Sequence, residues 1–167
     1  MMGGELQLRA IDANDEAFLR RVYAEARAHD VAAMGWDGAG AEAFLRMQFD
    51  AQHRHYQTHY PQARFDIVER AGEPLGRLYT ARSAEAIHVI DIALLARQRG
   101  QGIGSALLQG LQDEAARDGR RLTLQVERHN PAHALYLRLG FSDTELQGLY
   151  QAMQWQAGSP ASLQNIR

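Results

Sequence analysis

The sequence predicts an α/β domain built on a mixed sheet, and three observations lead to this prediction. Two stretches with helical periodicity follow an opening strand, three β-rich segments then come in succession, and helices alternate with strands after that. The expected order is β-α-α-β-β-β-α-β-α-β-β. A chain of 167 residues, of which 46% are hydrophobic, is long enough to bury a substantial core as one domain.

The N-terminal third is predicted to be mainly helical. "LQLRAI" (6–11) alternates like a strand, and Asn14 or Asp15 is placed to cap a helix that runs to about Ala28. Two glycine breaks within 29–42 predict a loop there. A second helix is expected over 41–61, where Pro61 ends it.

The middle of the chain is predicted to form strands 63–70, 73–81 and 85–95. The gaps between them are so short that neighbouring strands are expected to pair as antiparallel hairpins. Apolar side chains then recur with helical spacing from Ile103 until Gly119, a natural helix stop.

The C-terminal part is predicted to begin with a strand over 121–127. A helix over 130–140 follows, with Asn130 as its cap, Pro131 in its first turn and Gly140 at its end. A strand pair completes the fold. We expect residues 1–156 to form a single domain and 157–167 to be a mobile tail.

Composition excludes several classes of protein. A net charge of −2 argues against a general nucleic-acid binder, which needs an excess of basic charge. The chain has no cysteine, so disulfides, thiolate metal sites and cysteine nucleophiles are excluded. No apolar run approaches membrane-spanning length and no secretory signal is evident, so we expect a cytoplasmic protein without a membrane partner.

The stretch "ARQRGQGIGSALLQGL" (96–111) places three glycines in five positions before an apolar helix. A P-loop is excluded because the chain contains no lysine. A dinucleotide fingerprint would need a third glycine at Ser105, and antiparallel-looking strands precede this loop. Two interpretations remain open at this point: a backbone cradle for phosphate at the helix N-terminus, or a loop whose glycines only permit a tight turn.

Two motifs resemble the signatures of the GCN5-related N-acetyltransferases, the GNAT enzymes. "RGQGIG" (99–104) is similar to their R/Q-x-x-G-x-G/A signature, and "VERHNPAHALYLRLGF" (126–141) is similar to their second signature. The resemblance covers roughly residues 6–156 and implies a GNAT fold, with a mostly antiparallel sheet flanked by about four helices. It also implies a transfer of acetyl from acetyl-CoA to an amine.

The resemblance implies a set of acetyl-CoA contacts made largely by the backbone. A strand segment would pair with the pantetheine arm, the glycine loop would hold the pyrophosphate, Asn130 would bind the pantetheine amides, and Tyr136 would lie beside the sulfur. The full set is Ile92, Ala93, Leu94, Arg99, Gly100, Gln101, Gly102, Ile103, Gly104, Ser105, Asn130 and Tyr136.

The chemistry requires a neutral amine, although an alkyl amine has a pKa of about 10.4 in water. A carboxylate base is the usual remedy, and the candidates are Asp91, in the otherwise apolar run "HVIDIALL", and then Glu127. His88 is a weaker third candidate, and Glu127 is better explained as a solvated charge at a strand end or as a partner for Arg128. Tyr136 is expected to protonate the leaving thiolate in a ternary complex. Its alternative role is that of a half-buried helix aromatic.

The acceptor site in the family usually forms from the first two helices and their loop. The candidate lining residues are Trp36, Met47, Gln48, Gln52, Tyr56, Arg77 and Tyr79, although most of them would serve equally as core or surface residues. His55 and His59 stand one helical turn apart, but they lack a third ligand, so no metal is expected.

We therefore expect an acetyl-CoA-dependent N-acetyltransferase that acts on a small-molecule amine, as a monomer or homodimer. A peptide or protein acetyltransferase and a non-catalytic acyl-CoA-binding module are the alternatives.

Overall fold

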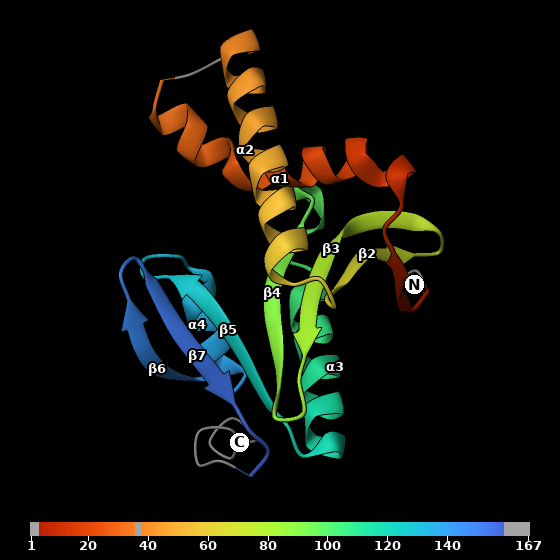
Figure 1. Ribbon diagram of the computed structural model, residues 1–167, viewed down its shortest axis with the longest axis vertical. Coiled ribbons are helices and arrows are strands. Elements are labelled where there is room, and N and C mark those ends of the chain that lie inside the picture. Colours follow the sequence, from red (N-terminus) through yellow and green to blue (C-terminus); the bar gives the residue numbers. More distant parts are fainter. Residues whose placement is uncertain (1–3, 36–37, 159–167) are drawn as a thin grey trace. The chain divides into compact units, whose positions relative to one another are not determined.

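A computed structural model of the protein describes residues 4–35 and 38–158 (Figure 1). The predicted order of strands and helices is confirmed. The elements are β1 (Leu6–Ala10), α1 (Glu16–Ala33), α2 (Gly38–His59), β2 (Arg64–Arg70), β3 (Glu73–Arg82), β4 (Ala86–Leu94), α3 (Ile103–Asp118), β5 (Arg121–Glu127), α4 (Ala132–Arg138), β6 (Ser142–Gln147) and β7 (Tyr150–Trp155). Two short 3-10 turns, η1 (Ala13–Asp15) and η2 (Ala96–Gln98), precede α1 and α3.

The strands form a seven-stranded sheet in the order β1-β2-β3-β4-β5-β7-β6. Antiparallel pairs join β1 to β2, β5 to β7 and β6 to β7, whereas β4 and β5 run parallel, with Ala86–Val89 opposite Arg121–Leu124. The predicted mixed, mostly antiparallel α/β class is therefore confirmed.

The chain divides into two compact units. The first unit holds the chain through Tyr79 together with Asp91–Arg99, and the second holds Thr80–Ile90 and the chain from Gly100 onward. The β3–β4 hairpin thus contributes residues to both units. No described helix is long and apolar enough to span a membrane.

Asp15, one of the two predicted caps, occupies the N-cap position of α1, but its side chain makes no capping bond to that helix. The side-chain caps belong to the preceding turn η1: Asp12 Oδ1 accepts the Asn14 N–H at 2.7 Å, while Asp15 Oδ2 accepts the Asp12 N–H at 2.8 Å. This reciprocal pair is a capping box, which satisfies two backbone donors at once. The alternative cap Asn14 is wrong because the prediction did not allow for a 3-10 turn ahead of the helix.

The predicted loop over 29–42 is also wrong for most of its length. Helix α1 continues to Ala33, and α2 already begins at Gly38. Alanine is the strongest helix former, so the pair Ala32–Ala33 sustains the helix until Gly35, whose positive φ of 75° ends the helical path.

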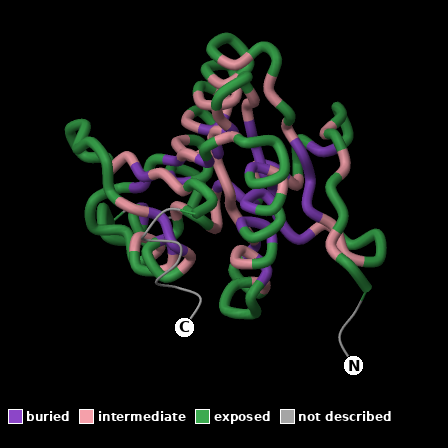
Figure 2. Tube along the Cα trace, turned by 90° about the horizontal axis from the view of Figure 1, so that it is seen from below, coloured by how far each residue is buried: buried purple, intermediate pink, exposed green. Residues whose placement is uncertain are grey.

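The core of the first unit lies mainly in its strands. β2 and the middle of β3 supply continuous runs of buried residues, whereas α2 buries Ala41 and Phe49 alone among its described residues. Figure 2 colours the buried residues of the described chain purple. The ring of Phe49 meets that of Tyr23 from α1 edge to face, with centroids 6.0 Å apart. These contacts fix the position of α2 against α1 within this unit.

The second unit is organised by β5 and α3. Leu122, Leu124 and Val126 are buried and alternate with more exposed neighbours along β5, as expected for a strand with one face on a core. Gly119 ends α3 in the left-handed conformation, which confirms the predicted stop. Gln112 of α3 donates to the Leu139 carbonyl at the end of α4, at 2.8 Å.

Candidate active site

Backbone conformation accounts for two of the three glycines in the loop before α3. Gly100 and Gly102 have φ angles of 74° and 81°, in the left-handed region that glycine adopts without a steric penalty. A Cβ atom added at either position, or at Gly104, would meet no heavy atom within 4 Å. Crowding by the protein therefore does not require these glycines, and they leave the backbone of the loop open on its outer side.

The N-terminus of α3 has the properties of an anion site. Its N-cap, Gly102, has no side chain to satisfy the first-turn donors, and the first intrahelical bond joins the Ala106 N–H to the Gly102 carbonyl at 3.0 Å. The amides of Ile103, Gly104 and Ser105 precede this bond and have no acceptor within the helix. The positive end of a 16-residue helix dipole lies at the same place.

Asn130 and Tyr136 lie at the start and within α4 of the same unit. Asn130 Oδ1 accepts the N–H of Ala132, the first residue of α4, at 2.9 Å, which leaves its Nδ2 group outside that bond. The N-cap position itself is held by Pro131, one residue later than predicted. Tyr136 is 9% exposed, and its ring meets Phe141 edge to face at 5.9 Å. Glu127 is the exposed last residue of β5, and its backbone carbonyl accepts the Asn130 N–H at 3.0 Å.

In the first unit, four predicted site residues gather around Arg77. This arginine lies on β3, and its side chain is only 4% exposed. Its Nε donates to Asp91 Oδ2 on β4, with which its Nη2 also forms an ion pair, and Nη2 donates to Gln52 Oε1 on α2 at 2.9 Å. Burial is the largest single influence on Arg77 and would lower its pKa, but the charge and hydrogen bond of Asp91 together with the electrostatic effects of Tyr79 and Tyr56 outweigh it, so the net shift is upward.

Aromatic rings enclose the same guanidinium. Its Cζ lies 4.9 Å from the ring centroid of Tyr79 and 6.0 Å from that of Tyr23. The Tyr23 hydroxyl donates to Gln48 Oε1 at 3.4 Å, so Gln48 also belongs to this group. We call these residues, Tyr23, Gln48, Gln52, Arg77, Tyr79 and Asp91, the Arg77 cluster.

Tyr79 has an unusual environment. It is fully buried, and its hydroxyl makes no hydrogen bond of ordinary geometry within the described structure, although the Arg77 cation is close enough to act on it electrostatically. Burial raises the pKa of Tyr79, and the positive charge of Arg77 lowers it by less. The side chain of Asp91, by contrast, keeps 24% of its surface exposed. Asp91 is thus the member of the Arg77–Asp91 pair that solvent or a ligand can reach.

The other acceptor candidates have different surroundings. Met47 is exposed, and Tyr56 meets Tyr79 edge to face at 5.9 Å. Trp36 lies outside the described residues. The sequence placed Arg77 only among lining residues and missed Tyr23 altogether. A signal for the ion pair was nevertheless present, because "PLGRLYTA" and "HVIDIALL" each carry one charge in an apolar strand, and the two charges are opposite.

The three histidines singled out in the sequence have different surroundings. His88, the third base candidate, lies in the second unit with Nδ1 2.8 Å from Thr123 Oγ1, and burial lowers its pKa. His55 and His59 on α2 stack with ring centroids 4.0 Å apart. Within 4–35 and 38–158, no three His, Asp or Glu side chains are grouped as a metal site would require.

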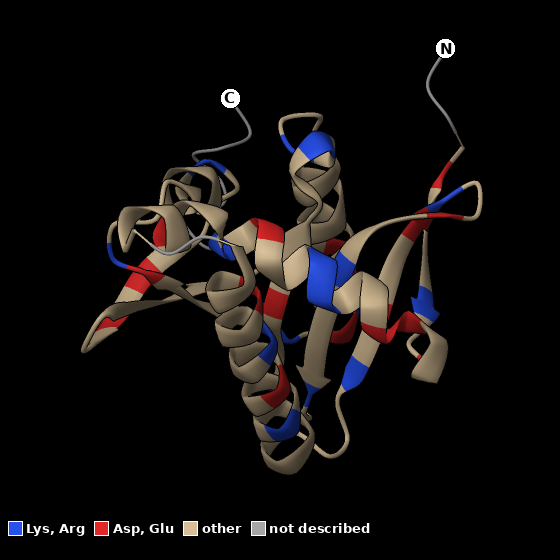
Figure 3. Cartoon of the chain, turned by 90° about the horizontal axis from the view of Figure 1, so that it is seen from above, with Lys and Arg blue, Asp and Glu red and all other residues tan. Residues whose placement is uncertain are grey.

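Charges of both signs are interspersed over the chain (Figure 3). Many of them are paired: Arg82 forms a two-pronged contact with Glu114 at 2.7 and 2.9 Å, and Arg9 binds Asp15 through both terminal nitrogens at 2.9 Å. Many of the described arginines thus have local carboxylate partners.

Comparisons with known proteins agree with the two sequence motifs. A model of the acetyltransferase (GNAT) family matches residues 34–141. The PaiA N-acetyltransferase from Thermoplasma acidophilum, solved with coenzyme A, is 16% identical with a TM-score of 0.69, over 91% of this chain and 99% of that chain. An acetyltransferase from Thermus thermophilus is 24% identical with a TM-score of 0.65, over 92% and 97% of the two chains.

A GNAT family acetyltransferase from Elizabethkingia anophelis, solved with acetyl-CoA bound, is 15% identical with a TM-score of 0.53. That likeness covers 61% of this chain and 82% of the other. Comparison with curated proteins gives no match. The three structures share the fold of this chain, and the family model identifies the acetyltransferase class.

Proposed function

Because the chain belongs to the acetyltransferase (GNAT) family, we propose that it transfers the acetyl group of acetyl-CoA to the primary amine of a small molecule. The observation that carries the proposal is the open glycine backbone joined to the uncapped N-terminus of α3. Two structures of the same fold, from Thermoplasma acidophilum and Elizabethkingia anophelis, were solved with coenzyme A or acetyl-CoA. These facts support an acyl-CoA as the donor substrate.

The residues present fit such a donor. The amides of Gly102–Ser105 would hold the pyrophosphate, because phosphate oxygens accept hydrogen bonds from first-turn N–H groups and favour the positive end of the helix dipole. The backbone of Ile92, Ala93 and Leu94, which follows the stretch of β4 that pairs with β5, would hold the pantetheine arm. Arg99, Gly100, Gln101 and Asn130 complete the proposed contacts. When bound, acetyl-CoA supplies the thioester carbonyl that an amine attacks.

Two proton transfers would then be carried out by residues of the chain itself. In the proposed reaction a C–N bond forms and the C–S bond breaks, so the attacking nitrogen loses a proton and the departing sulfur gains one. We propose that the Tyr136 hydroxyl donates the proton to the departing sulfur and that Asp91 accepts the proton from the attacking nitrogen. Glu127 and His88 are the other candidates for the base. Asp91 is first because the Arg77 cluster fixes its side chain while leaving it partly exposed.

The acceptor is proposed to be an amine because Asp91 offers it a carboxylate. Arg77 would orient that carboxylate directly, and Gln52 and Tyr79 would act on it only through Arg77. Arg77 and Tyr79 are buried and do not form an open pocket, and Gln48 is hydrogen-bonded to Tyr23. The proposed effect of Arg77, Gln52 and Tyr79 on the acceptor is thus exerted through Asp91. Trp36 remains a candidate for direct contact.

The test is release of the CoA thiol from acetyl-CoA with a panel of polyamines, amino acids, aminoglycosides, aryl amines and short peptides. We expect turnover with one class of small amine and a reduction of at least about tenfold in kcat for Tyr136→Phe, which is within the usual contribution of a positioned acid. The phenyl ring preserves the edge-to-face contact with Phe141. Tyr150→Phe, at an exposed tyrosine of β7, is the matched control and should behave like the unaltered chain.

Three results would change the proposal. Turnover with peptides but not with free amines would identify a peptide acetyltransferase. Absence of turnover, combined with a higher melting temperature in the presence of acetyl-CoA, would identify a binding module, because a ligand that binds the native state stabilises it. Absence of both effects would contradict every acyl-CoA function. The chain contains no lysine, so acetylation of its own lysines cannot contribute to the signal.

A further inference from the structure

A carboxylate from α1 holds the turn that leads into the glycine loop. Glu25 Oε1 accepts the backbone N–H of Ala96 at 2.7 Å, although the two residues are 71 positions apart. Ala96 is the first residue of η2, the turn between the end of β4 and the loop 99–104. Both residues belong to the first unit. The mechanism proposed above makes no use of Glu25.

The turn has no cap of its own. Its N-cap residue is Leu95, which lacks a side-chain acceptor, so the Ala96 donor takes its partner from a different element. Leu95 itself is fixed by its N–H, which donates to the Leu75 carbonyl at 2.9 Å. Glu25 therefore supplies, from α1, the capping bond that the local sequence lacks.

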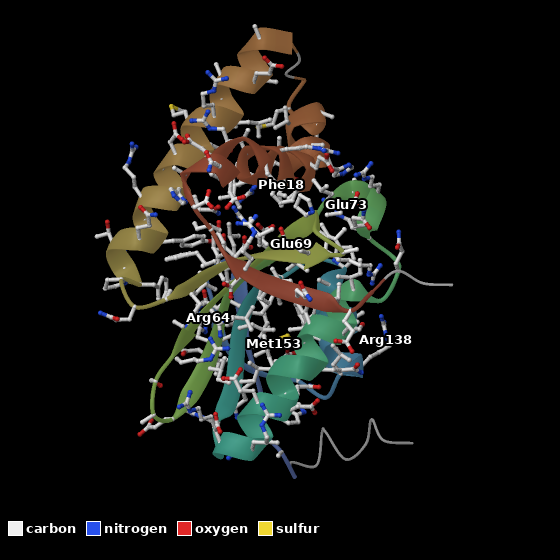
Figure 4. The ribbon with its side chains drawn as sticks, turned by 90° about the vertical axis from the view of Figure 1, so that its right-hand side faces the viewer. Phe18, Arg64, Glu69, Glu73, Arg138 and Met153 are labelled. Carbon is white, nitrogen blue, oxygen red and sulfur yellow. The ribbon has the colours of Figure 1, made fainter. Side chains whose placement is uncertain are left out.

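A second contact at the same turn is weaker. Arg97 and Glu73 form an ion pair at 3.0 Å, but their side chains are 61% and 57% exposed (Figure 4 labels Glu73). Exposed pairs contribute little to stability. Glu25 is shielded better, with 28% of its side chain exposed. Among the described side chains that hold the turn, Glu25 should therefore stabilise its conformation most.

The Glu25 carboxylate is held in its charged form. The Ala96 N–H lowers the pKa of Glu25, and Arg21, whose Nε lies 2.9 Å from Oε2, lowers it further. The bond to Ala96 is thus charge-assisted at neutral pH, which makes it stronger than a bond between neutral groups. The two carboxylate oxygens have separate partners, so the exposed ion pair with Arg21 is not part of the bond to Ala96.

We propose that Glu25 is a positioning residue for acyl-CoA binding: it fixes the turn Ala96–Gln98, from which the backbone donors of the glycine loop continue. This inference rests on the function proposed above. A loop that is ordered before the ligand arrives pays less conformational entropy on binding. Glu25 should therefore affect the affinity for the donor more than the rate of the chemical step.

The experiment compares Glu25→Ala and Glu25→Gln with two controls, Arg21→Ala and Glu73→Ala. The probe is coenzyme A, measured by calorimetry, together with hydrogen exchange at the Ala96 amide and the kinetics of thiol release. Alanine is a good helix former, so the first variant does not weaken α1 through propensity. Glutamine keeps an acceptor oxygen for Ala96 and is the conservative rescue.

We expect Glu25→Ala to bind coenzyme A about tenfold more weakly, the loss that one hydrogen bond to a charged group accounts for. The KM for acetyl-CoA should rise with kcat little changed, and the Ala96 amide should exchange faster. Glu25→Gln should recover part of both effects, because a neutral acceptor makes a weaker bond to Ala96 than a charged one. Each control should bind within about twofold of the unaltered chain, as exposed ion pairs contribute little.

Three results would overturn the inference. Unchanged affinity in Glu25→Ala, with normal binding by the unaltered chain, would refute this role while leaving the proposed function intact. An equal loss in Arg21→Ala would assign the effect to the helix surface instead. Failure of the unaltered chain to bind coenzyme A would refute the proposed function first and this role with it, whatever the exchange of Ala96 shows.

Discussion

The two units contain two kinds of candidate site. In the second unit the proposed pyrophosphate site consists of backbone donors, arranged by Gly100 and Gly102 and by the start of α3 within a few consecutive residues. In the first unit the Arg77 cluster consists of side chains from α1, α2, β3 and β4. A backbone site is encoded locally, whereas a side-chain site exists only after the chain has folded. The two should therefore respond differently to mutation.

The largest loss of stability should come from replacing Arg77, the centre of the Arg77 cluster. Arg77→Met leaves Asp91 and Gln52 without their buried partner, and we expect a loss of about 3 kcal/mol in the free energy of unfolding. This value is at the low end for buried pairs because Asp91 is partly exposed. Arg97→Met, at an exposed arginine with one carboxylate partner, should cost no more than about 1 kcal/mol. Urea denaturation at pH 7 measures both.

A double variant separates the ion pair from general packing. Arg77→Met combined with Asp91→Leu removes both charges, so it should be more stable than Arg77→Met alone, because no uncompensated charge remains in the protein. Equal losses in Arg77→Met and Arg97→Met would show that the cluster is not a special element of the first unit.

The backbone site can be tested with the same chemical change at two positions of one helix. Gly102→Ala and Gly110→Ala each add a methyl group that meets no atom within 4 Å. Gly102 has a φ of 81°, so alanine there should cost about 1 kcal/mol. Gly110 lies within α3, where alanine should stabilise by about 0.5–1 kcal/mol. Changes of opposite sign in the free energy of unfolding are the expected result.

Coenzyme A binding sharpens the same comparison. Gly102→Ala places its methyl group on the open side of the proposed cradle and should weaken binding, whereas Gly110→Ala should not. If both variants bind coenzyme A equally well, the glycines serve the turn alone. That result would favour the simpler of the two interpretations that the sequence left open.

The same contrast explains what could be predicted from the sequence. Element order and the ends of α3 follow from local patterns of glycine, proline and apolar spacing, and these predictions are confirmed. The extent of α1 was mispredicted because glycine breaks were weighted above the helix propensity of Ala32 and Ala33. Local sequence patterns predict the end of an element correctly where a single interaction determines that end.

The side-chain partners were beyond sequence reasoning for a physical reason. Gln52 and Arg77 are 25 positions apart, and Glu25 and Ala96 are 71 apart, so nothing local indicates that they meet. Asp91 was recognised as an unusual charge in an apolar strand, but its partner was assigned to the acceptor site. A charged residue in an apolar strand indicates that the strand takes part in a buried ion pair, but it does not identify the partner residue.

The smallest expected effect concerns two histidines, one in each unit. Burial lowers the pKa of both His53 and His88, and Arg77 lowers that of His53 further, against a smaller opposite effect of Glu16 and Asp50. The unfolded chain therefore binds these protons first as the pH falls below about 6.5. The free energy of unfolding should rise with pH between the lowered pKa values and about 6.5, and level off above it.

Replacement of Arg77 should change the pKa of one of these two histidines and not that of the other. In Arg77→Met the pKa of His53 should move up towards its ordinary value, because its second cause is removed, while that of His88 should stay where burial alone puts it. NMR titration of the imidazole signals measures both. A parallel shift of the two would mean that the substitution loosens the whole chain, and the Arg77 cluster could then not be treated as a property of the first unit alone.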